Sequence, residues 1–174
     1  MTVTVRAATG GDVAAIDALL RLTFPSPQEA GLVRDLCIDR DMVLTLVADD
    51  EDSGALAGVI VFSRMAVDVG GQAVPAVALA PLAVASGQRG QGVAGALIRT
   101  GLRDLADAGY ALCFVLGDPD FYAAHGFAVD WASGFDSPYA GEAFMAMPLQ
   151  DGAMPCGVRG HARHGAAFAQ SGGA

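Results

Sequence analysis

The sequence predicts a single mixed α/β (α+β) domain. Its first half combines two amphipathic segments with a run of strand-like segments separated by turns, and its second half contains one strand–helix–strand unit. The composition, 53% hydrophobic and only 17% charged, is that of a chain with a packed core rather than a disordered one. Short turns join antiparallel strands, whereas a helical crossover joins parallel ones. We therefore expect a mostly antiparallel sheet with one parallel pair, flanked by helices.

The first half is expected to contain two helices inside a series of strands. Residues 2–8 alternate in polarity, which predicts a strand, and apolar residues at helical spacing over 13–22 predict a helix. The break Pro25-Ser26-Pro27 separates this helix from a second one. The expected strands are 2–8, 42–48, 55–66 and 73–84, and the expected helices are 13–22 and 28–38.

In the second half, a helix is expected to connect two parallel strands. The segments in order are a strand at 77–84, a helix at 92–108, a strand at 111–116, a short helix at 119–124 and a strand at 143–149. We expect a frayed tail over 166–174. The domain is predicted to span 1–150, with 151–174 as a C-terminal extension of the same domain.

Charge and composition exclude several classes of function. The net charge of −9 and ten scattered basic residues argue against a nucleic-acid partner. No long apolar run or signal peptide is present, so we expect no membrane segment and a cytoplasmic location. All Lys and Arg residues of the chain are Arg, which excludes mechanisms that need a Schiff-base lysine or a Walker-type phosphate-binding lysine. The spacing of the three cysteines and three histidines predicts no metal site.

The most informative segment is 81–98, in which a glycine-rich turn leads from a strand directly into a helix. The first turn of a helix has N–H groups without internal partners and the positive end of the helix dipole. Glycines allow an anion to approach this backbone closely. The segment therefore predicts a site for a pyrophosphate, even in an acidic protein.

Three interpretations of this turn can be compared. The spacing from Gly87 to Gly92 is that of a P-loop, but Val93-Ala94 stand where Lys and Ser or Thr are needed, so we reject it. The run from Gly90 to Gly95 matches a dinucleotide fingerprint, with Asp118 after the next strand, but five residues intervene after the preceding strand and an antiparallel region precedes it. A glycine-softened turn without a ligand is the third interpretation.

A family resemblance favours a different ligand. Arg89-Gly90-Gln91-Gly92-Val93-Ala94 resembles the Q/R-x-x-G-x-G/A motif of the GNAT family of N-acetyltransferases. A second stretch, Phe121 to Phe127, resembles the Y-x-x-x-G-F signature of the same family, at the expected distance. Stretches at 79–84, 115–119 and 142–146 are similar to the YhbS-like subgroup of predicted acetyltransferases. The resemblance covers most of the chain and is weakest before Val43 and after Gln150.

The resemblance implies a GNAT-like fold in which the parallel strands splay apart and hold acetyl-CoA as a co-substrate. Main-chain amides of the first strand would pair with pantetheine, and the loop N–H groups would hold the pyrophosphate, with a charge-assisted contact from the Arg89 side chain. Arg99 and Arg103 are interpreted as a solvated helix face. The implied acetyl-CoA residues are Leu82, Ala83, Val84, Arg89, Gly90, Gln91, Gly92, Val93, Ala94 and Gly95.

The implied reaction is direct transfer of acetyl to an amine. Tyr122 stands at the family's general-acid position, where it would protonate the departing thiolate; the alternative is a core tyrosine whose hydroxyl is satisfied locally. The general base stays open because residues 73–84 contain no acidic side chain. Asp118, His125, Glu29 and an ordered water chain are the candidates, although Asp118 equally suits a helix cap.

The acceptor is expected to be a small-molecule or peptide amine, bound between residues 25–36 and 133–142. The missing acidic residue also keeps open a non-catalytic CoA-binding or regulatory module. A dinucleotide-dependent oxidoreductase is the third hypothesis. The resemblance allows a homodimer, and it implies no partner of another kind.

Overall fold

The structure, a computed structural model, describes residues 2–151 and 156–170. Within these residues a seven-stranded sheet has the order β1-β2-β3-β4-β5-β6, and β7 pairs with β3 outside this path. Among the strands of the described residues, only β4 and β5 pair in parallel, as predicted. The strands are β1 Val3–Ala7, β2 Met42–Asp50, β3 Leu56–Val69, β4 Gln72–Val84, β5 Leu112–Leu116, β6 Phe144–Pro148 and β7 Arg159–His164.

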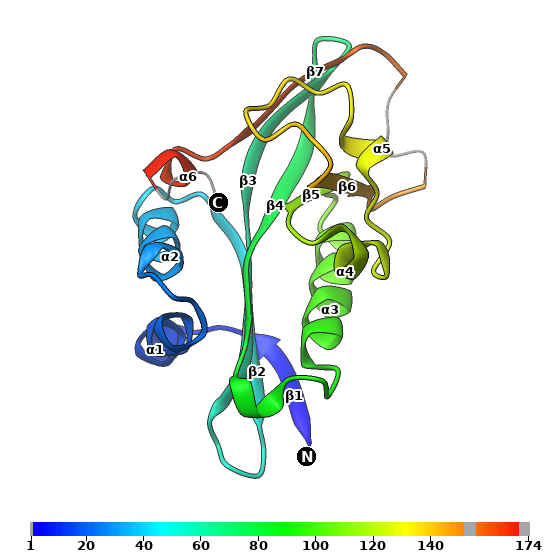
Figure 1. The fold of residues 1–174 in the computed structure, drawn as a ribbon. Coiled ribbons are helices and arrows are strands. Elements are labelled where there is room, and N and C mark those ends of the chain that lie inside the picture. Colours follow the sequence, from blue (N-terminus) through cyan, green and yellow to red (C-terminus); the bar gives the residue numbers. More distant parts are fainter. Residues whose placement is uncertain (1, 152–155, 171–174) are drawn as a thin grey trace.

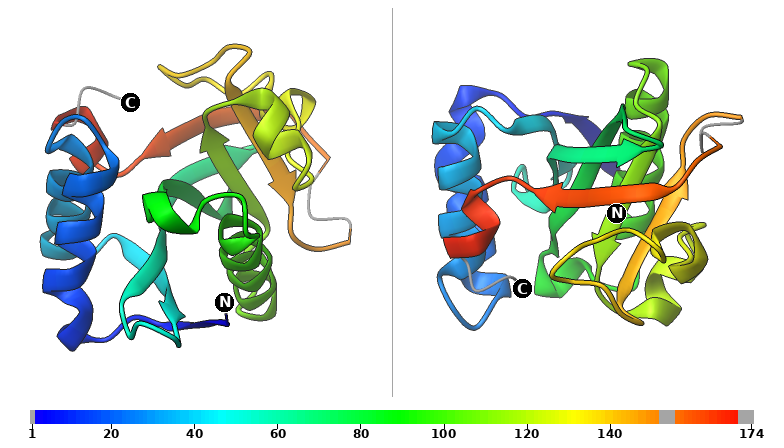
Figure 2. Two further views of the ribbon diagram at one scale, coloured as in Figure 1. Left: turned by 60° about the horizontal axis from the view of Figure 1, so that its bottom comes forward. Right: turned by 90° about the horizontal axis from the view of Figure 1, so that it is seen from above.

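Helices cover both faces of the sheet. Figure 1 shows α1, α2 and α6 on one side of the strands and α3 and α4 on the other, and the two rotated views agree with this layering (Figure 2). The helices are α1 Val13–Thr23, α2 Gln28–Ile38, α3 Val93–Asp107, α4 Pro119–Ala123, α5 Val129–Ala132 and α6 Ala167–Gln170, with 3-10 turns η1 Gly10–Asp12 and η2 Ser86–Gln88. No helix in the described ranges is long and apolar enough to cross a bilayer.

Two hydrophobic clusters fill the space between the sheet and these helices. One joins α1 and α2 to the sheet through side chains such as Leu20 and Leu36, and the other joins α3 to the opposite face through Leu97 and Ile98. A Cβ at Gly101 of α3 would lie only 2.4 Å from a ring carbon of Phe62. The helix therefore packs closely on β3 at this point.

The C-terminal region differs from the prediction. β3 is 14 residues long because one of its edges has two successive neighbours. Its residues Leu56 to Ser63 pair with β2, and Met65 to Val69 pair with β7. No strand was predicted over Arg159–His164, where β7 forms. A frayed tail was predicted from residue 166, yet α6 occupies Ala167–Gln170. Residues 171–174 of that expected tail lie outside the described residues. The domain boundary at 150 stays a prediction.

Why β7 was missed follows from its residues. Most of its side chains are polar (Arg159, His161, Arg163 and His164), and Gly160 and Gly165 lie in and directly after it. Such a composition does not favour a strand. The strand forms because the protruding half of β3 offers an unpaired edge.

Candidate functional site

The parallel strands β4 and β5 separate partway along their length. Their pairing ends at Leu79 and Val115, although β4 continues to pair with β3 as far as Val84. A register shift in the β3–β4 ladder accompanies this point, because two residues of β4 stand opposite one residue of β3. The edge of β4 from Ala80 to Val84 that faces β5 is therefore left without a strand neighbour.

The direction of the main-chain groups decides which residues can use this open edge. The Ala85 N–H donates to the Ala57 carbonyl of β3 at 2.8 Å, and the Ala83 carbonyl also faces β3, 3.0 Å from where a Cβ of Gly58 would stand. N–H and C=O groups alternate in direction along a strand. The main-chain groups of Leu82 and Val84 therefore face the gap, while those of Ala83 are directed to β3.

The loop after β4 leads into α3 in an open conformation. Gly90 and Gly92 have φ angles of 76° and 81°, in the left-handed region that glycine adopts without strain. A Cβ at either position would meet no atom within 4 Å. Gly92 is the N-cap of α3 and supplies no side-chain cap, so the N–H groups of Val93, Ala94 and Gly95 lack intrahelical acceptors. This is the geometry of an anion-binding helix start.

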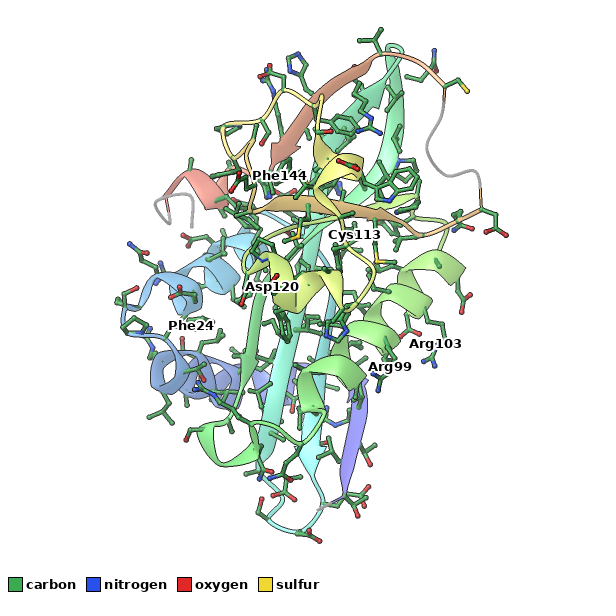
Figure 3. All side chains as sticks on the ribbon, turned by 45° about the vertical axis from the view of Figure 1, so that its right-hand side comes forward. Phe24, Arg99, Arg103, Cys113, Asp120 and Phe144 are labelled. Carbon is green, nitrogen blue, oxygen red and sulfur yellow. The ribbon has the colours of Figure 1, made fainter. Side chains whose placement is uncertain are left out.

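Two arginines lie near this helix start. Arg89 is exposed and forms no ion pair with the residues that the structure describes. Arg99 bends back along α3, and its Nη1 lies 3.0 Å from the place a Gly95 Cβ would take. Arg103, by contrast, pairs with Asp104 at 3.3 Å. Figure 3 shows Arg99 and Arg103 on the outer side of α3. Both side chains are exposed, as the solvated-face interpretation predicts, and Arg99 in addition lies over the first turn of α3.

A contact missed by the sequence analysis holds the loop in place. Gln88 Nε2 donates to Asp50 Oδ2 at 3.1 Å, and Asp50 at the end of β2 is buried, with 6% exposure. The same carboxylate accepts from the Ser53 hydroxyl at 2.7 Å and the Asp52 N–H at 3.0 Å. The Ser53 hydroxyl and then the Asp52 N–H lower the pKa of Asp50, so it stays charged. The β2–β3 turn therefore anchors the loop by one side-chain bond.

Tyr122 comes from α4, just past the end of β5. Its ring lies on Gly117, where a Cβ would stand 2.7 Å from Cε2, and Phe127 contacts it edge-on at 5.7 Å. Burial, followed by the charge of Cys113, raises the pKa of Tyr122 to about 12. Its hydroxyl has no hydrogen bond to any described residue and is not among the buried polar atoms. The locally satisfied core tyrosine is thus not what this geometry shows.

His125 brings the second sequence motif to the first. Its Cε1 lies 3.5 Å from the Cβ position of Gly95, and its ring stands 5.1 Å from Phe121. The end of α4 and the first turn of α3 are therefore in contact, although 30 residues separate them. The fold places Tyr122 and the loop on the same face of the sheet.

The candidates for the general base differ in their surroundings. Asp118 accepts a hydrogen bond from the Asp120 N–H at 3.0 Å and caps α4. This is the helix-capping role that the sequence suggested as the alternative to a general base. Glu29, in the first turn of α2, has a buried Oε2 without a hydrogen-bond partner in the described part of the chain. No group of three His, Cys, Asp or Glu side chains that could hold a metal occurs among residues 2–151 and 156–170.

Part of the chain is similar to known proteins. Residues 4–129 match the family model described as an acetyltransferase (GNAT) domain. The chain is 47% identical over 116 residues to the uncharacterized N-acetyltransferase YhbS of Escherichia coli K12, covering 67% of this chain and 68% of that protein.

Two solved structures extend the match to nearly the whole chain. One is YhbS from Escherichia coli in complex with CoA, with a TM-score of 0.87 and 38% identity over 96% of this chain and 92% of that one. The other is a GNAT acetyltransferase from Brucella melitensis in complex with acetyl-CoA, with a TM-score of 0.74 and 28% identity over 96% and 98%.

Proposed function

The chain belongs to the GNAT acetyltransferases, and from this premise we propose that it transfers an acetyl group from acetyl-CoA to a primary amine. The observation that carries the proposal is the gap between β4 and β5, which runs into the uncapped start of α3. Two similar proteins were crystallised with CoA and with acetyl-CoA, which supports the same co-substrate here. A cytoplasmic location and a homodimer remain predictions.

The open edge of β4 and the loop fit the two ends of such a ligand. The main-chain groups of Leu82 and Val84 would pair with pantetheine amides as an added strand does. The N–H groups between Arg89 and Gly95 would hold the pyrophosphate, because the left-handed glycines keep the approach clear. Arg89 and Arg99 would add positive charge beside it.

The transfer requires an uncharged amine. The nitrogen lone pair forms a bond to the thioester carbon, the C–S bond breaks, and sulfur leaves with the bonding electrons. One proton must leave the nitrogen and one must reach the sulfur, so the reaction is balanced by a base and an acid. The Leu82 N–H lies on the same open edge and farther from the loop than Val84, so it is the donor available to the oxygen charge that develops during the attack. The Leu82 carbonyl and the Val84 groups are then left for pantetheine.

Tyr122 is the proposed acid. A tyrosine whose pKa is raised by burial keeps its proton throughout the neutral range, and a hydroxyl without a protein partner is free to donate it. Of the candidate bases, we propose testing Glu29 first, because its buried oxygen lacks a partner and Asp118 is used as a cap.

The test is release of free CoA thiol with a panel of amines, with the products identified by mass spectrometry. The proposal expects acetylated amine and CoA in equal amounts, and a slower reaction with Glu29→Gln at unchanged acetyl-CoA affinity. Binding of acetyl-CoA without turnover of any amine would favour the non-catalytic module instead.

A further inference from the structure

A cavity lies away from the loop at α3. It has a volume of about 510 Å³ and is lined by residues 136–139, before β6, and by 163–166, 168 and 169, at the end of β7 and in α6. This is within the range of small-molecule sites. All these residues lie outside the 4–129 segment that matches the family model. The shared segment thus builds the gap between β4 and β5, and the remainder of the chain builds this cavity.

Aromatic side chains form one wall of the cavity. The His164 ring contacts Tyr139 edge-on, with centroids 4.9 Å apart, and Phe168 at 4.7 Å. Burial lowers the pKa of His164 to about 4, so the imidazole is neutral at physiological pH. Its Nδ1 is buried without a hydrogen-bond partner in the described ranges. Nε2 is not buried in this way, and it is the nitrogen through which His164 can meet a ligand.

The cavity lies behind the end of the β5–β6 pair, opposite Tyr122. The Gly117 N–H donates to the Ala143 carbonyl at 3.1 Å, and Gly117 itself supports the Tyr122 ring. The next residue, Phe144 (labelled in Figure 3), belongs to the cluster on the α2 side, with its ring centroid 6.2 Å from that of His164. The cavity therefore lies on the face of the sheet opposite α3, on the side to which Phe144 points.

The charges around the cavity favour one positive charge and disfavour two. Asp41 stands behind the cavity wall, its carboxylate 2.8 Å from the Cβ position of Gly165, and aromatic faces attract ammonium groups. At the rim, Asp136 is engaged by His161 at 3.0 Å, and Arg163 lies 3.4 Å from the same imidazole nitrogen. A second ammonium group there would meet the Arg163 guanidinium.

We propose that this cavity is the acceptor site and that it takes a primary monoamine with an apolar, ring-bearing body. The body packs on Tyr139 and Phe168, and the amine N–H groups are oriented by His164 Nε2. This assignment rests on the proposed acetyl transfer. It adds the class of acceptor, and it has the acceptor bind on the face of the sheet opposite α3. It also places acceptor specificity in the segment after residue 129.

The test measures binding of 2-phenylethylamine to the CoA-loaded protein by calorimetry, with spermidine and glycine as comparisons. Two variants alter the cavity: Ala166→Trp fills it from an exposed position, and His164→Phe removes the ring nitrogens while keeping an aromatic side chain. Ala18→Trp, on the exposed side of α1, is the matched control. CoA affinity is measured separately for every protein.

We expect 2-phenylethylamine to bind the wild type at least 10-fold more tightly than either comparison amine. Each cavity variant should weaken that binding at least 10-fold while CoA affinity changes less than 2-fold, and Ala18→Trp should change neither. Unaltered amine binding in Ala166→Trp and His164→Phe would overturn the acceptor site. Tighter binding of spermidine, or no binding of 2-phenylethylamine to the CoA-loaded protein, would overturn the proposed class. If the wild-type protein did not bind CoA, the proposed function itself would be contradicted.

Discussion

The two faces of the β4–β5 region are built in different ways. On the α3 side, the loop, the helix start and Tyr122 come from one stretch of about 40 residues, in which local sequence determines the geometry. On the α2 side, the cavity needs the segment before β6, the last strand and α6 to meet, and their contacts depend on pairing of β7 with the distant β3. Local sequence motifs can therefore predict the site on the α3 side, but they cannot predict the cavity on the α2 side.

This difference also separates the roles proposed for the two faces. The α3 face carries main-chain donors and two arginines, which suit a phosphate-bearing ligand. The α2 face carries aromatic rings and a neutral imidazole, which suit an apolar amine. Variants on one face should therefore leave binding of the other face's ligand unchanged.

The largest effect is expected for Tyr122→Phe. Removing a general acid slows proton transfer, so kcat should fall by about 10²-fold while acetyl-CoA affinity is unchanged. Tyr110→Phe, a partly buried tyrosine at the α3–β5 turn, is the control and should keep its rate. Steady-state kinetics measure kcat, and calorimetry measures acetyl-CoA affinity. An unchanged kcat in Tyr122→Phe would show that Tyr122 contributes packing and not proton transfer.

The second effect concerns the α2 face and is a loss of stability in mild acid. His164 has a folded pKa of about 4, below its ordinary value of 6.5, so the unfolded chain binds the proton first as pH falls. Stability is then fully present above pH 6.5 and is lost as pH falls toward 4, by about 2 kcal/mol at pH 4.5. Denaturant unfolding between pH 7 and 4.5 should show this loss in the wild type. His164→Phe should lack it, and an equal loss in both proteins would contradict the burial argument.

A third prediction compares two glycines of the same conformation. Gly92 and Gly71 have φ angles of 81° and 77°, and neither has an atom within 4 Å of its Cβ position. Alanine at either should cost about 1–2 kcal/mol of stability because of the left-handed backbone. Only Gly92→Ala should weaken acetyl-CoA binding, by about 10-fold (about 1.4 kcal/mol), since its methyl group enters the approach to the N–H groups. Equal weakening by Gly71→Ala would show that the effect is general strain.

The smallest effect is expected at the anchor of the loop. Gln88→Ala removes the hydrogen bond to Asp50, while Asp50 keeps the Ser53 and Asp52 donors. The loop becomes less ordered before binding, and acetyl-CoA affinity should fall by about 3-fold, which corresponds to less than 1 kcal/mol. Gln72→Ala, exposed at the start of β4, is the matched control for calorimetry.

Much of the fold could be predicted from the sequence because it depends on local patterns. Alternation located β1, and apolar segments between turns located β2 to β4. Helical spacing located α1, and the proline break and the glycine-rich turn located the starts of α2 and α3, in each case to within a few residues. The crossover rule gave the parallel pair, since a helix separates β4 from β5. The GNAT motifs gave the family, which the family model and the YhbS match confirm.

What could not be predicted depends on contacts between distant segments. β7 has a polar sequence and exists because β3 protrudes beyond β2. Asp50 and Gln88 are 38 residues apart, and no spacing rule connects a β2 terminus to the loop. The main-chain direction that separates Leu82 and Val84 from Ala83 follows from the register of β4 against β3. His164 showed no motif, because its surroundings arise from Tyr139, Phe144 and Phe168.

The most direct test of the central claim is calorimetric titration of the pure protein with acetyl-CoA, with NADH as the comparison ligand. If the start of α3 and the open edge of β4 form the acetyl-CoA site, acetyl-CoA should bind with a Kd of about 1 μM to 100 μM, and NADH should give no heat. Absence of acetyl-CoA binding in both calorimetry and thermal shift, or equal binding of NADH, would contradict the account.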